Sequence, residues 1–453
     1  MACIDPRTEI SSCRRRAPWA LVVVFLAVTA QAQDFTDPVD AAEAFLDRMV
    51  HGEFGEARGQ FDSPMDSAMP GDALKQTWDV FTARTGAFEE VVQVRREIAG
   101  MFHIAIFTCK FERSFQDIKI VVNNAMEVSG LYFLPPPDTD TPPPYADTTQ
   151  FDESDIKVGT GDWVLPGTLS MPKGDGPFPA VVLVHGSGPQ DRDETIGPNK
   201  PFRDLAWGLA SRGIAVLRYE KRTKHYQARL TGLTKDFTVN EETVDDAAAA
   251  INALRFTAKI DNRHLYVIGH SLGGTLAPRI AKKNTAIAGI IVLAGSTRPL
   301  GDILLEQMEY VFGLDGTVSK DEQLALDTTR EKVAVIFNQP LTADTPAGEL
   351  LFGVPASYWI DFRAYDPVET AVSLDIPMLF MQGGRDYQVT EKDFAGWRNA
   401  LKTEERVTFK YMPNLNHIFV PGTGKSTPNE YTIAGHVVVT AIDFIAKWVN
   451  DRR

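Results

Sequence analysis

Cysteine is almost absent from this chain of 453 residues. Of its three cysteines, Cys3 and Cys13 lie near the N-terminus, and only Cys109 lies further along. We therefore expect no structural metal site built on thiolates, because such sites need several cysteine ligands at close spacing. Cys109 stands in the alternating run "FHIAIFTCKFE", which predicts a thiol packed in a β-strand rather than a reactive one.

A long hydrophobic run is missing as well. The apolar segment at residues 17–30 has about 14 residues, whereas a membrane-spanning helix needs roughly 20. Three arginines at residues 14–16 precede it, and the small-x-small motif "AQA" follows at residues 30–32. This order predicts a secretory signal peptide at residues 1–32, with an uncleaved membrane anchor as the alternative.

Cleavage after this segment would remove two of the three cysteines, so the mature chain could form no internal disulfide. We expect export to the periplasm or the extracellular space, no stable insertion into a membrane, and stability that comes from a large hydrophobic core.

Basic residues are outnumbered. The chain has 46 basic and 60 acidic residues, and removal of residues 1–32 leaves 42 and 58, a net charge of −16. No lysine or arginine run follows, which argues against nucleic acid and anionic membranes as partners. The sequence also lacks a phosphate-binding glycine loop, an H-E-x-x-H helix and an acidic cation-binding loop, so neither a cofactor nor a metal is expected.

Proline-rich composition divides the chain in two. Residues 134–149, "LPPPDTDTPPPYADTT", predict a stiff, solvated linker. Ahead of it, helical spacing at residues 37–54 and 72–85 is followed by alternating β-rich runs at residues 88–133. This order predicts a small α+β domain at residues 36–133.

A second and larger domain is expected at residues 150–453. Its short apolar runs alternate with helical patterns, which is typical of a parallel α/β sheet. The strand-like runs are "PAVVLVHGSG", "IAVLRY", "HLYVIG", "IAGIIVLAG" and "IPMLFMQG". The alternation breaks at about residues 299–375, where helical and aromatic segments predict a cap over the ligand crevice. The alternative is a helical insertion that lies far from the crevice and has no role in ligand binding.

The motif Gly269-His270-Ser271-Leu272-Gly273 has the pattern G-x-S-x-G. The pattern alone is weak evidence and is compatible with a simple turn. Here a strand pattern precedes it and a helix pattern follows, which is the setting that exposes a serine hydroxyl above a sheet edge. We therefore predict that Ser271 is a nucleophile.

A serine hydroxyl needs a base to take its proton and an acid to orient that base. In such folds they follow the serine in the order acid, then histidine. Asp386 comes directly after a predicted strand, and only His417 and His436 lie beyond it. His417 follows the last strand pattern in a loop, whereas His436 lies in a run interpreted as a C-terminal helix. We predict Asp386 as the acid and His417 as the base.

Two backbone N–H groups should stabilise the oxyanion, one after the nucleophile and one after an earlier strand. These are predicted to be the N–H groups of Leu272 and Ser187. His185 is expected to shape its turn, and His270 to pack beneath the serine. Three nearby cations are interpreted as partners of an acidic loop rather than as substrate ligands. The cations are Arg218, Lys221 and Arg222, and the acids are Asp191, Asp193 and Glu194.

Residues 185–222, "HGSGPQDRDETIGPNKPFRDLAWGLASRGIAVLRYEKR", resemble exported bacterial esterases of the α/β-hydrolase superfamily, in its dienelactone-hydrolase and prolyl-oligopeptidase-like branch. The resemblance extends from about residue 155 to the end. It implies an α/β-hydrolase sheet with a helical cap insertion, and the same roles for Ser271, Asp386 and His417. A small domain similar to the nuclear transport factor 2 fold commonly precedes such hydrolases, and residues 36–133 fit that position. One departure is Glu220, where related sequences often have Asp.

Together these features predict a secreted serine hydrolase that cleaves small-molecule carboxylic esters with short acyl chains through an acyl-enzyme. A peptidase of the prolyl-oligopeptidase type and a non-catalytic binding protein on a hydrolase scaffold are the alternatives. The sequence leaves open the natural acyl and alcohol groups and the oligomeric state. Six aromatic residues of the insertion are expected to line an acyl pocket. They are Tyr310, Phe312, Phe352, Tyr358, Trp359 and Phe362.

Overall fold

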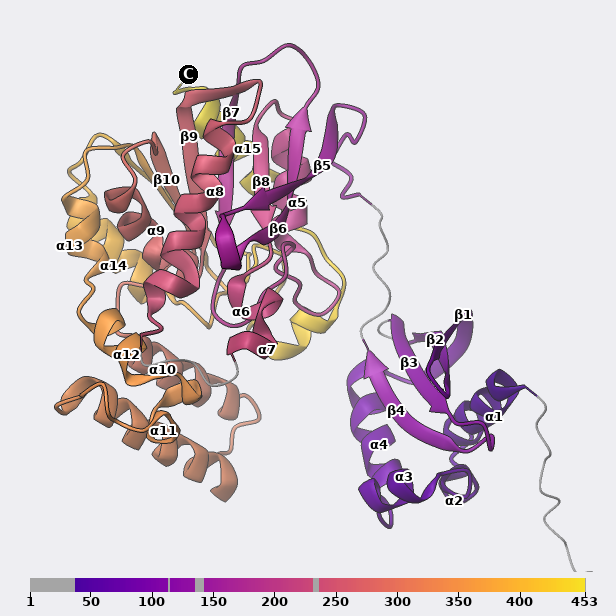
Figure 1. Cartoon of the computed structure of the whole chain (residues 1–453). Helices are drawn as coiled ribbons and strands as arrows, with labels where there is room; N and C mark the ends of the chain where they lie inside the picture. Colours follow the sequence, from indigo (N-terminus) through magenta and orange to yellow (C-terminus); the bar gives the residue numbers. More distant parts are fainter. Residues whose placement is uncertain (1–36, 113–114, 135–141, 231–235, 453) are drawn as a thin grey trace, which may run out of the picture.

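The structure, a computed structural model, describes residues 37–112, 115–134, 142–230 and 236–452 (Figure 1). The predicted signal peptide at residues 1–32 and much of the proline-rich segment lie outside these residues. Within the described residues, no helix has the length and apolar character needed to cross a bilayer.

The N-terminal domain has four helices followed by a four-stranded antiparallel sheet in the order β1-β2-β3-β4. The helices are α1 (Pro38–Val50), α2 (Phe54–Arg58), α3 (Ser63–Ala68) and α4 (Ala73–Thr85). The strands are β1 (Phe88–Ala99), β2 (Phe102–Phe111), β3 (Phe115–Val122) and β4 (Val128–Leu134). The predicted helices and β-rich runs are confirmed. Cys109 is fully buried in β2, and burial raises the pKa of its thiol to about 12, as expected of a packed strand residue.

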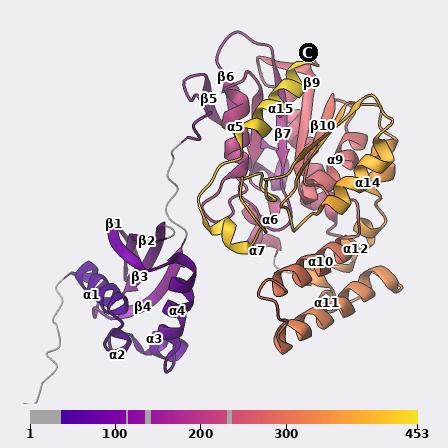
Figure 2. The same cartoon turned by 180° about the vertical axis from the view of Figure 1, so that it is seen from behind.

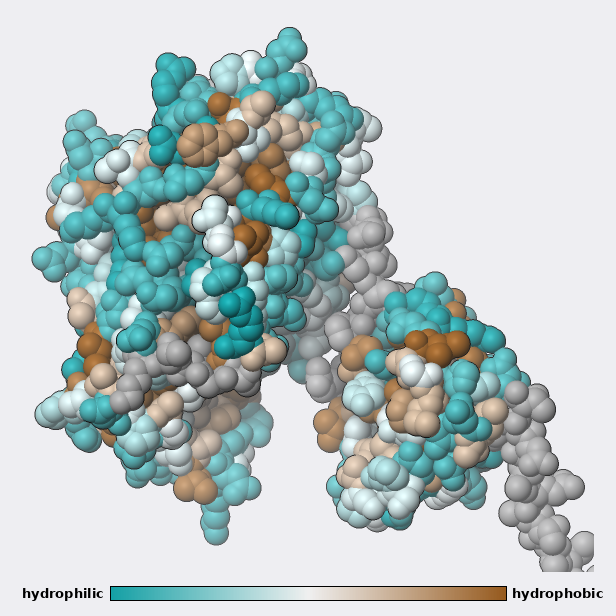
Figure 3. Space-filling view, viewed as in Figure 1, coloured by the Kyte–Doolittle hydropathy of each residue, from teal (hydrophilic) through white to brown (hydrophobic). Residues whose placement is uncertain are grey.

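β1 is a long edge strand of this sheet. Most of its side chains are exposed, including Val92 and Ile98, and apolar surface gathers over the end of the small domain that carries β1 and β2 (Figure 3). Register shifts interrupt its pairing with β2, and charged residues flank its valines. Bulges and charges of this kind discourage edge-to-edge pairing with other chains.

The C-terminal domain is built on an eight-stranded sheet in the order β12-β11-β10-β9-β7-β8-β6-β5. The six strands from β12 to β8 are parallel, and β6 and β5 continue the sheet antiparallel. The strands are β5 (Phe151–Val158), β6 (Leu165–Pro172), β7 (Phe178–Val184), β8 (Ala215–Tyr219), β9 (Ile260–His270), β10 (Gly289–Leu293), β11 (Met378–Gly383) and β12 (Val407–Met412). The predicted parallel α/β sheet is confirmed.

Successive side chains of the central strands enter two separate cores. Along β7, Val182 and Val184 pack into one core, while Val181 and Leu183 pack into the other. Each core is covered by helices on its own face of the sheet (Figures 1 and 2). Helices α8 (Asp245–Arg255), α9 (Leu272–Lys283) and α14 (Glu391–Leu401) cover one face, and α5 (Pro201–Ala210) and α15 (Val439–Asn450) cover the other. Burial on both faces explains why these strands are continuous apolar runs.

A helical insertion joins β10 to β11. It contains α10 (Leu300–Phe312), α11 (Lys320–Asn338), α12 (Ala356–Arg363) and α13 (Pro367–Val372), with short 3-10 turns at Ala347–Glu349 and Leu351–Gly353. In Figures 1 and 2, α10, α11 and α12 form a helical layer at one end of the domain.

The last residues of the predicted linker pack on the C-terminal domain. The Tyr145 ring lies against Gly208 of α5 and joins the core under α15. The Asp147 N–H donates to Ser211 Oγ at 2.9 Å. The sequence interpretation missed this because one aromatic residue among prolines shows no periodicity. The structured part of the C-terminal domain therefore starts ahead of residue 150.

This packing predicts a difference between two truncated proteins. A protein that begins at Pro142 keeps Tyr145, whereas one that begins at Thr148 loses it, and neither loses a predicted site residue. The shorter protein should be less stable by about 1–2 kcal/mol, because a half-buried aromatic ring is removed. Urea denaturation of both proteins measures the difference, and equal stabilities would show that Tyr145 contributes nothing.

Candidate active site

Ser271 lies in a sharp turn between β9 and α9. Its backbone has φ 52° and ψ −117°, a conformation that costs a non-glycine residue about 1–3 kcal/mol. The Ser271 N–H donates to the carbonyl of Leu293 on the neighbouring strand at 2.9 Å, which helps to hold the turn. This is the strand-to-helix setting that the motif predicted.

Steric constraints explain why glycine occupies both ends of the motif. A Cβ at Gly269 would lie 2.1 Å from the Gly273 carbonyl oxygen, and one at Gly273 would lie 2.2 Å from the Val184 carbonyl oxygen. Because backbone atoms cannot move aside as a flexible side chain can, only glycine fits at either position. The turn is therefore packed tightly against the end of β7.

Topology places this turn at the crevice of the sheet. After β7 the chain forms β8 on one side of β7 and then returns to form β9 on the other side. The carboxyl ends of β7 and β9 therefore flank a topological switch point, where open α/β sheets bind ligands. Ser187 follows β7 and Ser271 follows β9, so both lie at this switch point.

His417 and Asp386 are brought together by the loops that follow β12 and β11. His417 Nδ1 lies 2.7 Å from Asp386 Oδ2, and both residues are buried. The other carboxylate oxygen, Oδ1, accepts the N–H groups of Gln388 and Val389 at 2.8 and 3.0 Å. Gln382 Nε2 donates to Oδ2 at 3.0 Å. With Asp386 fixed in this way, Nδ1 of His417 carries the proton and Nε2 keeps its lone pair.

A cavity of about 320 Å³ connects these groups. Ser271 and His417 line it together with Ser187 and Leu272, the residues whose N–H groups are the predicted oxyanion donors. No hydrogen bond joins Ser271 Oγ to His417 within the described residues. Such contacts are commonly loose before substrate binds and tighten in the complex. All five predicted site residues are therefore gathered around one cavity, Asp386 through its contact with His417.

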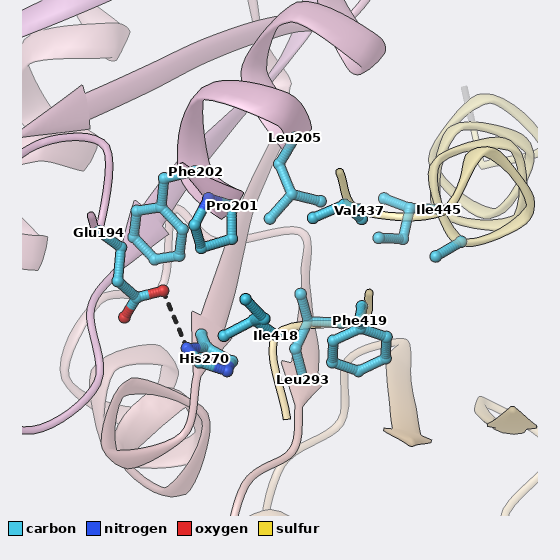
Figure 4. A pocket seen from close by; sticks show the side chains of 11 residues that line it. Glu194, Pro201, Phe202, Leu205, His270, Leu293, Ile418, Phe419, Val437 and Ile445 are labelled. Atoms are coloured by element: carbon cyan, nitrogen blue, oxygen red, sulfur yellow. Dashed lines mark ion pairs between the residues drawn. The ribbon is translucent and has the colours of Figure 1, made fainter. Parts of the chain in front are cut away.

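Glu194 links three loops of this site. Its carboxylate accepts the Gly186 N–H at 2.6 Å and lies 2.8 Å from Nδ1 of His270 (Figure 4). The other ring nitrogen of His270, Nε2, lies 3.0 Å from the backbone oxygen of His417. One buried chain of contacts thus joins the loop of Ser187, the serine turn and the loop of His417.

Each partner of the Glu194–His270 pair stabilises the charge of the other. Burial alone would lower the pKa of His270, but the Glu194 carboxylate raises it above its ordinary value. Burial would raise the pKa of Glu194, but His270 lowers it. In Figure 4 the pair stands at one end of a small pocket whose other walls, including Phe202 and Leu205, are apolar. His185 differs, since burial lowers its pKa to about 4 and its Nε2 contacts the Asp191 carbonyl.

The predicted pairing of the charged loops is correct only for Arg218, which forms an ion pair with Asp193 and a second one with Glu153. Lys221 instead lies 3.0 Å from Glu242, and Arg222 pairs with Asp246. These acids precede and begin α8, far along the sequence, so spacing along the chain did not reveal them.

The interpretation of His436 as helical is wrong. α15 begins at Val439, and His436 lies ahead of it with Nδ1 at 3.1 Å from Asp204. Residues 434–438 belong to no helix or strand, and the apolar content of the run "HVVV" alone gave the impression of an earlier helix start. His436 does not line the cavity of Ser271.

The insertion covers the site. Leu300, Ile303 and Leu304 of α10 line the cavity with Phe352 and Phe362. Of the six aromatic residues predicted to form a pocket, Tyr358 and Trp359 line a neighbouring cavity, also with Phe352. Tyr310 stacks on Tyr387 instead, and Phe312 lines neither cavity.

Comparison with known protein families agrees with this geometry. A family model described as "Alpha/beta hydrolase family" matches residues 181–434, more than half of the chain. The chain belongs to the alpha/beta hydrolase family. Residues 42–131 match a family described as a protein of unknown function.

This hydrolase is homologous over nearly its whole length to an esterase. Esterase EstD of Thermotoga maritima is 37% identical over 429 residues, which cover 94% of this chain and 99% of the relative. Among solved structures, an acylaminoacyl peptidase of Pyrococcus horikoshii matches 80% of this chain and 56% of its own, with 14% identity and a TM-score of 0.44. A dienelactone hydrolase of Anabaena variabilis matches 67% of this chain and 98% of its own, with 16% identity and a TM-score of 0.38.

Sequence reasoning missed two functional contacts of this hydrolase. Gln382, which holds the Asp386 carboxylate, looked like the end of a strand, and Glu194 looked like one more acid in a charged loop. The pattern "QDRDET" directly after the Ser187 turn was the only available signal for Glu194. Within the described residues, no group of three or more His, Cys, Asp or Glu side chains could hold a metal ion.

Glu194→Gln should lower kcat by about 10- to 100-fold with little change in KM. The neutral amide keeps the shape but loses the ion pair, and small displacements of catalytic groups have effects of this size. Steady-state kinetics with a soluble ester measures both constants. Glu220→Gln is the matched control, since Glu220 pairs with Arg192 and touches neither Ser271 nor His417. Equal kcat for Glu194→Gln and the unchanged protein would rule out this positioning role.

Proposed function

We propose that this protein is an exported serine hydrolase that cleaves carboxylic esters with short acyl chains through an acyl-enzyme. The observation that carries the proposal is the position of Ser271, in a strained turn that shares a cavity with the His417–Asp386 pair. Homology to an esterase over nearly the whole chain supports the same reaction class.

In the first half of the reaction, Nε2 of His417 takes the Ser271 proton as the hydroxyl attacks the ester carbonyl. The N–H groups of Leu272 and Ser187 stabilise the oxyanion, and no other hydrogen bond from either N–H occurs within the described residues. His417 then donates its proton to the departing alcohol. Asp386 keeps the ring oriented and stabilises its positive charge.

In the second half, water attacks the acyl-enzyme, with His417 again acting first as base and then as acid. The liberated carboxylic acid leaves, and Ser271 recovers its proton. This cycle needs no group beyond the side chains and N–H groups of the chain itself.

Export is supported by the order of arginines, apolar segment and "AQA" motif at residues 14–32. The test is expression with the leader intact, followed by cell fractionation and N-terminal sequencing of the recovered protein. A chain that begins directly after Ala32 outside the cytoplasm is expected. An uncut chain that stays with the membrane would support the uncleaved anchor instead, and a chain found in the cytoplasm would contradict export.

Esters are favoured over peptides because of the leaving group. An amine is a poorer leaving group than an alkoxide or phenolate, so amide cleavage demands more from His417. Cleavage of short-chain p-nitrophenyl esters should therefore far exceed cleavage of unmodified peptides.

The deciding measurement is kcat/KM for p-nitrophenyl acetate and butyrate beside a panel of peptides, amidated and free at the C-terminus. We expect a ratio of at least about 10³ in favour of the esters. Peptide turnover comparable to the best ester turnover would replace the esterase proposal with a peptidase of the same mechanism.

A further inference from the structure

Two cavities adjoin at the predicted oxyanion donors. The larger has a volume of about 460 Å³, and Ser187 and Leu272 line both it and the cavity of about 320 Å³. Ser271 and His417 line only the smaller one. A carbonyl oxygen held by the N–H groups of Ser187 and Leu272 would therefore lie where the two cavities meet.

This arrangement assigns one cavity to each side of an ester. His417 must protonate the departing alkoxide, so the alcohol part belongs in the smaller cavity, which His417 lines. The acyl part then extends into the larger cavity. That cavity, lined by Phe237, Phe352, Tyr358 and Trp359, is called the aromatic chamber below.

We propose that the aromatic chamber binds an acyl group that contains an aromatic ring with a hydrogen-bonding substituent at its far end. This inference rests on the proposed esterase function and extends it beyond short acyl chains. The volume lies in the range of small-molecule sites, roughly 300–1,000 Å³, and an acetyl group leaves most of it unfilled.

The walls of the chamber favour a flat, rigid group. The rings of Phe237 and Tyr358 are nearly parallel, and Tyr358 meets Trp359 edge to face with ring centres 5.5 Å apart. Aromatic pairs gain stabilisation beyond the area they bury. A ring also loses fewer rotatable bonds on binding than a linear chain of similar size.

Unpaired polar groups in residues that line the chamber are the reason for proposing a hydrogen-bonding substituent on the ring. Trp359 is fully buried, and its indole N–H has no hydrogen-bond acceptor within the described residues. The hydroxyl of Thr223, another residue that lines the chamber, has no partner there either. Buried donors of this kind are costly when unpaired. Both atoms are closed to solvent in this structure, so binding as proposed includes a rotation of the two side chains toward the chamber, where a phenolic hydroxyl or methoxy group on the substrate ring offers them an acceptor.

Glu242 adds an acceptor to the same wall. It is 7% exposed, and its carboxylate accepts a hydrogen bond from the Tyr358 hydroxyl at 2.7 Å. The same carboxylate lies 3.0 Å from Lys221 Nζ. Because Lys221 also donates to the Gly186 carbonyl at 2.8 Å, the chamber wall is tied to the loop that carries Ser187. The acyl group and the oxyanion are therefore held by one connected framework.

The test keeps the leaving group constant and changes only the acyl group. The substrates are the p-nitrophenyl esters of acetate, 3-phenylpropanoate and 3-(4-hydroxyphenyl)propanoate, with each kcat/KM divided by the alkaline hydrolysis rate of that ester. The phenylpropanoate ester should exceed the acetate ester by at least about tenfold, as filling an apolar pocket typically gives. The hydroxylated ester should be better still.

Two substitutions localise the effect. Val354 lines the chamber and is half-buried, so Val354→Trp should fill it and lower the phenylpropanoate-to-acetate ratio by about tenfold or more. Leu304 lines only the smaller cavity, so the matched change Leu304→Trp should affect both esters alike and leave the ratio unchanged. Thr223→Val should remove the preference for the hydroxylated ester. If Val354→Trp does not fold, this variant provides the test of the aromatic chamber.

The outcomes separate the two proposals. If the unchanged protein does not hydrolyse the acetate ester, or if Ser271→Ala hydrolyses it equally well, the proposed function itself is contradicted. Acetate hydrolysis that depends on Ser271, with a phenylpropanoate-to-acetate ratio below about tenfold or a ratio that Val354→Trp does not lower, would contradict only the aromatic chamber. If Thr223→Val still prefers the hydroxylated ester, the proposed role of Thr223 in binding the substituent is wrong.

Discussion

Ser271→Ala should lower ester hydrolysis by several orders of magnitude, up to roughly 10⁶ in kcat, while the protein folds normally. The substitution removes the hydroxyl that is proposed to form the acyl-enzyme, and it leaves His417, Asp386 and the N–H groups in place. Ser271 already occupies a strained conformation, and alanine meets the same backbone restriction without a larger side chain. Stopped or continuous assays with p-nitrophenyl butyrate measure the loss.

Ser296→Ala is the matched control. Ser296 lines the same cavity, and its hydroxyl contacts Thr275 Oγ1 at 2.9 Å rather than any group of the proposed mechanism. It should keep activity within about tenfold, since it loses only one buried hydrogen bond. If purified, folded Ser271→Ala hydrolyses esters nearly as fast as the unchanged protein, the serine-hydrolase proposal is wrong.

His417→Ala should match the Ser271 variant, with a loss of about 10⁴- to 10⁶-fold in kcat. Without the imidazole, no base takes the serine proton and no acid protonates the leaving alcohol. The Asp386 carboxylate then keeps its backbone donors but loses its hydrogen bond to the imidazole. Kinetics across pH 5–9 should show no recovery at high pH beyond that of spontaneous hydrolysis.

His436→Ala provides the comparison for this prediction. His436 is partly exposed and contacts Asp204 near α5, away from the cavity of Ser271. It should remain active, with at most a modest loss of stability. If His436→Ala is inactive and His417→Ala is active, the base has been assigned to the wrong residue although the reaction class survives.

Local patterns were sufficient to predict the serine turn and the parallel strands. The motif around Ser271 is visible within five residues, although Gly273 is required by its approach to the Val184 carbonyl of β7. A strand buried on both faces is apolar along its whole length. The order of acid and base could be predicted because each follows its own strand. These features depend on short segments, and short segments are visible in a sequence.

Features that depend on distant partners were not predictable in this way. β5 is largely polar and β6 contains prolines near its ends, so their place in the sheet depends on the pairing of β6 with β8 and of β5 with β6 rather than on their own composition. Lys221 pairs with Glu242 and Arg222 pairs with Asp246 only because α8 packs across the sheet. Glu194 gains its importance from His270, which is adjacent in space and remote along the chain.

The insertion leaves and re-enters the sheet at neighbouring strands. β10 and β11 pair in parallel, with Ile290 opposite Met378, so the two attachment points are fixed by sheet hydrogen bonds whatever the chain between them does. The entropy of closing such a segment grows only as the logarithm of its length, about 0.6 kcal/mol per doubling. The insertion thus resembles a replaceable module: we expect that a segment of different length and composition could join the same two strands and alter the walls of the cavity while the strand ends that carry Ser271 and Asp386 keep their positions.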